Sequence, residues 1–307
     1  MVIEYRSIND MTEAIFRNLY KLPHDIDLVV GIPRSGMLPA NLIALFLNKP
    51  FADIDSFIEG RVYTSGERGS FINDDKSKKV LVVDDSLRTG NALIKAKNKL
   101  KDLLADDKYT LFFGVVYATT DSCNMIDFFC ENIDSPRVFQ WNIFHNIHFT
   151  SKACFDIDGV LCPNPPIDDD GEQYIKYLKE APILYKPSVE IDTLVSCRLE
   201  KYRDITEEWL KKNNIKYRKL LMLDLPSKEA RLKWGKHGEY KAGIYSESHN
   251  ILFIESSYYE AVTIAKMSHK PVFCVENFSM INSNVAITKN KIYHILLKFK
   301  QFFKCLL

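Results

Sequence analysis

Two segments of the chain place carboxylates directly after strands that read as buried. In the first, residues 80–83 are four apolar residues, followed by Asp84 and Asp85 and then by the turn 86–90. Open α/β sheets bind ligands at the carboxyl ends of their strands, and a turn into a helix presents backbone N–H groups to an anion. Paired carboxylates can accept from vicinal hydroxyls, so the segment suits a sugar phosphate. The usual P-loop is excluded because no Gly-Lys-Ser/Thr run is present.

The second segment, residues 155–162, reads Phe-Asp-Ile-Asp-Gly-Val-Leu-Cys. Asp156 and Asp158 are separated by one residue, follow an apolar strand and precede a glycine turn. Two such carboxylates can share one metal ion. The first can attack phosphorus while the second protonates the leaving oxygen. This pattern predicts phosphoryl chemistry.

The elements that must position these residues are strands alternating with helical patterns. Continuous apolar strands separated by helices indicate parallel sheets covered on both faces. At roughly 100–200 residues per domain, 307 residues suggest two domains. We therefore expect an α/β protein of two doubly wound, Rossmann-like parallel-sheet domains. The expected parts are a first domain over 1–150, a second over 151–286 and a terminal helix over 287–307.

Residues 80–93 resemble the PRPP (5-phosphoribosyl diphosphate) fingerprint of type I phosphoribosyltransferases, with Asn91 where a threonine is common. The resemblance covers roughly residues 25–120 and implies Mg²⁺–PRPP as substrate. It puts Asp84 and Asp85 on the ribose hydroxyls. Around the 5-phosphate it puts Ser86, Leu87, Arg88, Thr89 and Gly90.

Two further segments follow the order of that family. Residues 31–40 resemble its pyrophosphate loop, in which Arg34 meets the diphosphate while Ser35 and Gly36 let the backbone approach. Residues 60–70, with Arg61 and Arg68, stand where the family has a flexible catalytic loop. A solvated hairpin loop is the alternative for that segment.

The aromatic segment before residue 150 has two interpretations. Its side chains Trp141, Phe144 and His145 line an acceptor pocket or belong to interdomain core.

Residues 155–162 resemble motif I of the haloacid dehalogenase-like (HAD) superfamily of phosphatases. The resemblance implies Mg²⁺ held by Asp156, Asp158 and Glu255. Ser196 would bind a phosphoryl oxygen and Arg198 the substrate, and Lys241 would be the motif III lysine, with Lys233 and Lys236 as competitors. Serines rather than a second acid follow Glu255, a departure from the family. The short gaps between motifs indicate a capless member with an open cleft.

The composition of the chain limits which partners it can bind and in which cell compartment we expect it. The chain has 41 basic and 40 acidic residues and a formal charge of +1, which argues against a large nucleic-acid interface. Seven cysteines without a CxxC pair suggest reduced thiols, and no signal peptide or membrane span is recognised, so we expect a cytoplasmic protein. Residues 287–307 carry five lysines and no acid. They read either as a basic amphipathic helix on an anionic membrane surface or as a helix docked on the protein.

The pairing of the two resemblances implies consecutive chemistry. The first domain would transfer 5-phosphoribose to an acceptor, and the second would remove the 5-phosphate. This resembles fused enzymes of bacterial ribofuranose-containing surface polysaccharides, with a glycan or lipid-linked glycan as acceptor, and it is compatible with a homodimer. The alternatives are nucleobase salvage coupled to a nucleotide phosphatase, and a PRPP-sensing regulator.

Overall fold

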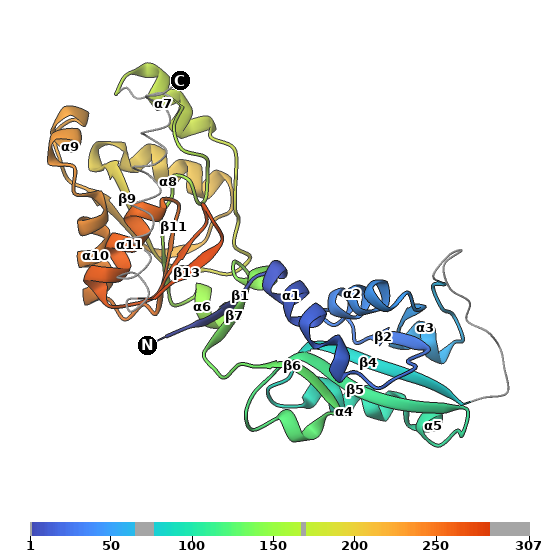
Figure 1. The fold of residues 1–307 in the computed structure, drawn as a ribbon. Helices are drawn as coiled ribbons and strands as arrows, with labels where there is room; N and C mark the ends of the chain where they lie inside the picture. The colour runs from blue at the N-terminus through green and yellow to red at the C-terminus, as the bar shows by residue number, and fades with distance from the viewer. Residues whose placement is uncertain (1, 65–76, 167–169, 283–307) are drawn as a thin grey trace, which may run out of the picture. The chain divides into compact units, whose positions relative to one another are not determined.

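The computed structural model describes residues 2–64, 77–166 and 170–282 (Figure 1). The chain forms two compact units, which we call the N-terminal unit, Arg6–Arg137, and the C-terminal unit, Met1–Tyr5 with Val138–Leu307. The units divide earlier than the expected position near residue 150, because Val138, Ile143 and Phe149 pack in the core of the C-terminal unit. Arg68 and the expected helix 287–307 lie outside the described residues.

The N-terminal unit is built on a parallel five-stranded sheet. Its strand order is β3-β2-β4-β5-β6, and every neighbouring pair is parallel. The chain runs from β2 outward to β3 and then from β4 through β5 to β6, so the winding reverses between β2 and β4. Ligands of doubly wound sheets bind at such a switch point. The strands are β2 (Leu28–Gly31), β3 (Phe51–Asp53), β4 (Lys78–Ser86), β5 (Tyr109–Ala118) and β6 (Phe128–Asn132).

Helices cover both faces of this sheet. Val80 and Val82 of β4 pack with α3 (Ile54–Ile58) and α4 (Asn91–Lys99). Leu81 and Val83 alternate with them, are equally buried and face the other way. The helices α1 (Ile8–Asn18) and α2 (Met37–Leu47) contact the sheet and each other. The short helix α5 (Lys101–Leu104) precedes β5.

The C-terminal unit has a six-stranded sheet in the order β10-β9-β8-β11-β12-β13. The first five strands are parallel, as expected, but β13 is antiparallel to β12. Only a four-residue turn, 275–278, separates these two strands, and so short a connection permits only an antiparallel pair. The winding reverses between β8 and β11. The strands are β8 (Ala153–Phe155), β9 (Ile191–Leu199), β10 (Tyr217–Leu223), β11 (Leu252–Glu255), β12 (Val272–Cys274) and β13 (Ser279–Ile281).

Alternation along these strands produces two hydrophobic cores, one on each face. Phe155 and Leu194 point to the core shared with α7 (Glu172–Glu180) and α8 (Arg203–Lys212). Their neighbours Cys154 and Val195 point to the core shared with α10 (His237–Glu247) and α11 (Tyr258–Ser268). The remaining helices are α6 (Ile147–Thr150) and α9 (Lys228–Trp234).

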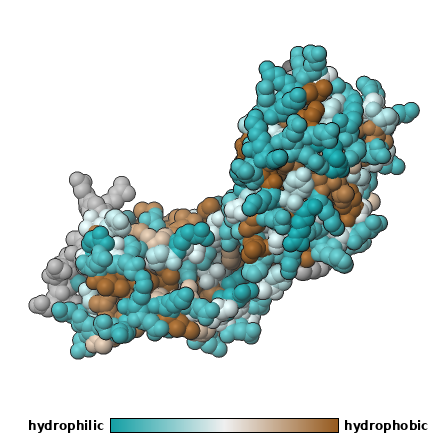
Figure 2. All heavy atoms as spheres, turned by 180° about the vertical axis from the view of Figure 1, so that it is seen from behind, coloured by the Kyte–Doolittle hydropathy of each residue, from teal (hydrophilic) through white to brown (hydrophobic). Residues whose placement is uncertain are grey.

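Near the junction of the two units, β1 (Glu4–Arg6) pairs with β7 (Arg137–Phe139). Hydrophilic side chains cover most of the face seen in Figure 2, with separate hydrophobic patches between them. Among the described residues, no helix combines the length and the apolar character needed to cross a bilayer.

Candidate functional sites

In the N-terminal unit, the loops after β2 and β4 meet at the switch point. The Ile32 N–H donates to the Val83 carbonyl at 2.8 Å, which holds the first loop against the end of β4. The Ser35 hydroxyl lies 3.3 Å from the Asp84 carboxylate, and the Asp85 N–H donates to the same carboxylate at 2.8 Å. The structure thus brings together Ser35, Asp84 and Asp85, which the sequence analysis assigned to diphosphate and ribose.

Gly36 allows the two loops to approach this closely. A Cβ on Gly36 would lie 2.5 Å from the Val83 carbonyl oxygen and 2.8 Å from the Asp84 Cα. Both are backbone atoms of a buried strand, so neither can move aside at low cost. Glycine is therefore required here by packing against β4. Its expected role beside the diphosphate stays a prediction.

Both acids of the pair are buried. Burial, reinforced by the charge of Asp85, raises the pKa of Asp84 to about 7. Ionising two adjacent carboxylates in a poorly hydrated site is unfavourable, because both desolvation and mutual repulsion oppose it. A bound proton, a hydroxyl donor or a cation reduces this penalty. The pair is therefore suited to accepting hydrogen bonds from a diol.

In the turn after Asp85, some residues pack against the sheet and others are exposed to solvent. Leu87 is 3% exposed, and its N–H donates to the Tyr117 carbonyl at 2.8 Å, so this amide belongs to the sheet and not to a phosphate cradle. Ser86 is half-buried, while Arg88 and Thr89 are exposed on the open side of the turn. Gly90 has a φ of +78° and starts α4, a conformation that favours glycine.

Of the other residues expected to bind substrate, two arginines are exposed to solvent, and one aromatic residue packs in the core of the C-terminal unit. Arg34 is exposed, and the exposed guanidinium of Arg61 pairs with Glu59. Phe144 is not part of an open pocket: it stacks on Tyr185 with 4.8 Å between ring centroids and packs in the core of the C-terminal unit.

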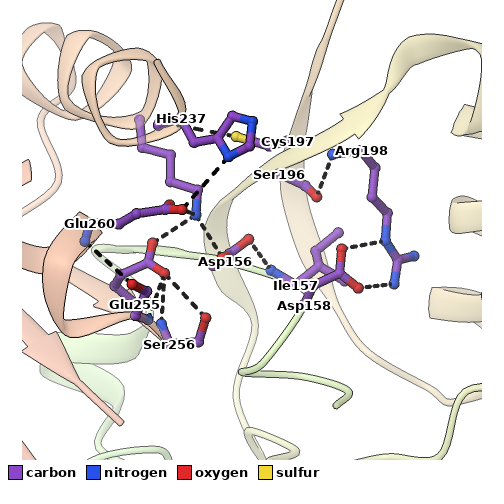
Figure 3. Close-up of polar contacts among 12 residues, drawn as sticks. Asp156, Ile157, Asp158, Ser196, Cys197, Arg198, His237, Glu255, Ser256 and Glu260 are labelled. Atoms are coloured by element: carbon purple, nitrogen blue, oxygen red, sulfur yellow. Dashed lines mark hydrogen bonds and ion pairs between the residues drawn. The ribbon is translucent and has the colours of Figure 1, made fainter. Parts of the chain in front are cut away.

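In the C-terminal unit, four of the expected residues converge at the carboxyl ends of β8, β9 and β11 (Figure 3). Asp156 directly follows β8, and its N–H donates to the Ile254 carbonyl of β11. The Lys241 ammonium, from α10, donates to Asp156 at 2.7 Å and to Glu255 at 2.8 Å. Ser196 of β9 is fully buried beside them. Lys233 and Lys236, the competing lysines, are exposed.

A third carboxylate completes the contacts of Lys241. Glu260, in the first turn of α11, accepts from the ammonium at 2.7 Å. The sequence analysis missed this acid because it sought a partner next to Glu255, where Ser256 and Ser257 stand. Ser257 caps α11 and Glu260 lies three residues later, a spacing typical of a helix N-terminus. That spacing is the signal that could have identified it.

The charges of this cluster shift its titration strongly. Burial alone would lower the pKa of Lys241, but three carboxylates outweigh burial and raise that pKa well above its usual value. Burial raises the pKa of Asp156, and Lys241 offsets part of that rise. Burial would also raise the pKa of Glu260, but hydrogen bonds and charge from His237 and Lys241 lower it to about 2. Lys241 thus opposes the effect of burial on Asp156, although the pKa of Asp156 stays above its ordinary value.

Asp158 points away from Lys241 toward a buried arginine. The Arg198 guanidinium donates two hydrogen bonds to the Asp158 carboxylate, at 2.9 and 2.7 Å. The Arg198 side chain is 0% exposed. The sequence analysis expected Arg198 to bind substrate, but the structure places its guanidinium on Asp158 instead, because that carboxylate neutralises it where water does not reach.

The cluster can be tested for its fit to Mg²⁺. Within the described ranges, no group of three or more His, Cys, Asp or Glu side chains is arranged as a ready metal site. Three carboxylates around one ammonium nevertheless leave an excess of two negative charges. Asp156 and Glu255 could supply the one or two carboxylates that Mg²⁺ requires beside its waters. The Asp158 side chain is engaged with Arg198, so any contribution from this residue would come from its backbone carbonyl.

One family model matches the N-terminal part of the chain. Residues 3–144 match the family model described as the phosphoribosyl transferase domain. The region of this match includes Arg34–Gly36 and Asp84–Gly90, and it ends before Asp156. No curated protein matches the chain.

Several solved phosphoribosyltransferases align with part of the chain. A purine phosphoribosyltransferase from Pyrococcus horikoshii has 22% identity and a TM-score of 0.34, covering 46% of this chain and 94% of its own. A xanthine-guanine-hypoxanthine phosphoribosyltransferase from Helicobacter pylori has 16% identity and a TM-score of 0.34, with coverages of 46% and 93%. An orotate phosphoribosyltransferase from Aeropyrum pernix has 21% identity and a TM-score of 0.27, with coverages of 38% and 63%.

The raised pKa of Asp84 predicts how the stability of the N-terminal unit depends on pH. The folded unit holds a proton up to about pH 7, whereas the unfolded chain releases it near its ordinary value of 3.8. Stability should therefore fall as the pH rises from about 4 to 7. Asp84→Asn should flatten this fall, because it removes the titrating group.

The measurement is calorimetry of the ligand-free protein at pH 5 and pH 8. All three tryptophans, Trp141, Trp209 and Trp234, belong to the C-terminal unit. The N-terminal transition is therefore the one without a change in tryptophan fluorescence. An equal fall in wild type and Asp84→Asn would contradict the prediction.

The Lys241 cluster predicts a large loss of stability on removal of its ammonium. Lys241→Met leaves three carboxylates facing one another, and breaking a buried ion pair from one side costs about 3–5 kcal/mol. Urea unfolding followed by tryptophan fluorescence would report this loss in the C-terminal unit. The matched control is Lys233→Met on exposed α9, expected to change stability by less than about 0.5 kcal/mol. Equal stabilities of the two variants would show that the cluster is not coupled to folding.

Proposed function

We propose that the protein transfers a 5-phosphoribosyl group from PRPP to an acceptor in its N-terminal unit and removes the 5-phosphate in its C-terminal unit. Phosphoribosyl transfer is supported by the family match over residues 3–144. The observation that carries the second activity is the Lys241 ammonium shared between Asp156 and Glu255 at the end of a parallel sheet.

In the transfer step, the acceptor hydroxyl attacks C1 of PRPP, the bond from C1 to the diphosphate oxygen breaks, and the acceptor loses its proton. Attack on the α-configured C1 gives a β-ribofuranoside. Asp84 and Asp85 would accept from the ribose hydroxyls, and the loop containing Ser35 and Gly36 would lie against the diphosphate. The protein contributes mainly orientation and charge neutralisation.

In the phosphatase step, a carboxylate oxygen of Asp156 attacks phosphorus, and the bond to the ribose O5 breaks as that oxygen gains a proton. Water then hydrolyses the acyl phosphate and releases inorganic phosphate. Lys241 would offset part of the rise that burial causes in the pKa of Asp156, and it would orient this carboxyl group for attack. The family resemblance assigns the proton exchange to Asp158. In this structure Asp158 is held as the anion that pairs with Arg198, so it would have to take up a proton and release that pair before it could act as an acid. Mg²⁺, when bound by Asp156 and Glu255, would neutralise charge on the phosphoryl group.

The two steps fit one substrate that passes from transfer to dephosphorylation. Loss of the 5-phosphate removes the group that the turn 86–90 would hold, so the product cannot return to the first site by the same contacts. The described parts of the second unit contain α7 between β8 and β9 but no separate cap domain. Without a cap, the residues at the ends of β8, β9 and β11 would be open to a bulky phosphomonoester. A glycan acceptor, free or lipid-linked, meets this requirement.

The test is a mass-spectrometric assay of the full chain with Mg²⁺, PRPP and candidate glycan acceptors. Wild type should release both pyrophosphate and phosphate. Asp156→Asn should release pyrophosphate alone and accumulate a phosphoribosylated acceptor, because the nucleophile is lost while transfer persists. Asp84→Ala should release neither. Asp55→Asn, at an exposed position of the same unit, is the control and should behave as wild type.

Three results would replace this proposal. Turnover of orotate, uracil or a purine, but of no glycan, would establish nucleobase salvage. PRPP binding without release of pyrophosphate from any acceptor would indicate a PRPP sensor. Pyrophosphate release without dephosphorylation by wild type would leave the C-terminal unit without the proposed activity.

A further inference from the structure

One backbone carbonyl in the turn after β4 is held from behind by two side chains. The Leu87 carbonyl accepts from the Arg137 guanidinium at 2.9 Å and lies 3.2 Å from the Ser122 hydroxyl. Arg137 and Ser122 stand 50 and 35 residues later in the sequence, and neither belongs to the segments that suggested PRPP. Both lie in the N-terminal unit.

These two side chains are themselves fixed in place. The other guanidinium arm of Arg137 donates to the Ile133 carbonyl at 2.8 Å. Ser122 is 2% exposed, and its oxygen accepts from the Thr119 N–H at 3.0 Å and from the Thr119 hydroxyl at 2.8 Å. With these two hydrogen bonds accepted, the single Ser122 proton is left for the Leu87 and Thr119 carbonyls, at 3.2 and 3.3 Å.

Because the peptide bond is planar, fixing the Leu87 carbonyl also fixes the direction of the Arg88 N–H. In a planar trans peptide the C=O and the following N–H point in opposite directions. The Leu87 carbonyl points toward Arg137 and Ser122, so the Arg88 N–H points to the other, open side of the turn. The Leu87 N–H is already used by Tyr117, so both peptide planes around Leu87 are set. The Arg88 amide is thereby aimed where a 5-phosphate would lie.

We propose that Arg137 and Ser122 are positioning residues that orient the Arg88 amide toward the phosphate of the ribose substrate. Arg137 adds a positive charge behind the turn, within electrostatic reach of Asp85 and Arg88. Its planar fork spans two carbonyls, which the single ammonium of a lysine does not reproduce. This inference rests on the proposed phosphoribosyl transfer and adds two residues that touch no reacting atom.

The experiment separates the two ends of PRPP by using its fragments. Binding of ribose 5-phosphate and of pyrophosphate, each with Mg²⁺, is measured by calorimetry on the full chain. Arg137→Gln should weaken ribose 5-phosphate binding about tenfold, the effect of losing a charged hydrogen bond. It should leave pyrophosphate binding within about twofold, because the loop containing Arg34 is untouched. Ser122→Ala should act in the same direction with a smaller effect.

Two further variants complete the design. Arg137→Lys should restore only part of the affinity for ribose 5-phosphate. Arg17→Gln, at an exposed position of the same unit, should leave both ligands unchanged. If Arg137→Gln lowers the melting temperature and weakens the binding of both ligands, its effect is a general loss of structure. The positioning role is then tested by the ligand affinities of Ser122→Ala alone.

The outcomes for the two proposals differ. Wild-type binding of ribose 5-phosphate, together with unchanged affinity in Ser122→Ala and in a folded Arg137→Gln, would overturn the positioning role and leave phosphoribosyl transfer standing. Absence of ribose 5-phosphate binding by wild type would overturn both. Selective loss of ribose 5-phosphate, with pyrophosphate retained, would support the positioning role.

Discussion

A parallel strand that is buried on both faces leaves little room for a charged side chain in its middle, so charges gather in its last residues and just beyond them. Both sheets obey this constraint. Val80–Val83 are fully buried, and Asp84 and Asp85 follow them. Ala153–Phe155 are equally buried, and Asp156 follows them. In each unit these acids stand where the winding reverses, so the loop of a second strand can approach without crossing the sheet.

The two sites meet the cost of buried charge in opposite ways. Lys241 satisfies its three donors on three carboxylates, and Arg198 is matched to Asp158. These cations are part of the fold and remain after product leaves. Asp84 is different, because burial and the neighbouring charge of Asp85 outweigh its hydrogen bonds and raise its pKa. The acids of the second unit are therefore neutralised within the fold, while burial of Asp84 in the first is offset by protonation.

The difference explains how much of each site the sequence could reveal. Residues close in sequence, such as Asp84 to Gly90 or Asp156 and Asp158, were predicted from local pattern, as were the strands that carry them. The antiparallel β13 was not, because a short turn overrides the parallel rule only at an edge. Glu260 was not predicted, because it lies in the first turn of α11 and not directly after β11. Only the fold brings it to Lys241. The C-terminal core also extends back to Val138, since the aromatic residues before 150 pack there.

Arg198 shows how burial can give a residue of a predicted motif a contact other than the one that the motif implies. A charged residue two positions after Ser196 reads as a surface group that meets substrate, because arginine is rarely buried without a partner. The structure supplies that partner through Asp158, 40 residues earlier. A buried arginine cannot leave its carboxylate without stranding a charge. The pair therefore holds the turn after β8 to β9, and the two aspartates of that turn face different cations. Two carboxylates with the same side chain, one residue apart, are therefore held in different electrostatic environments.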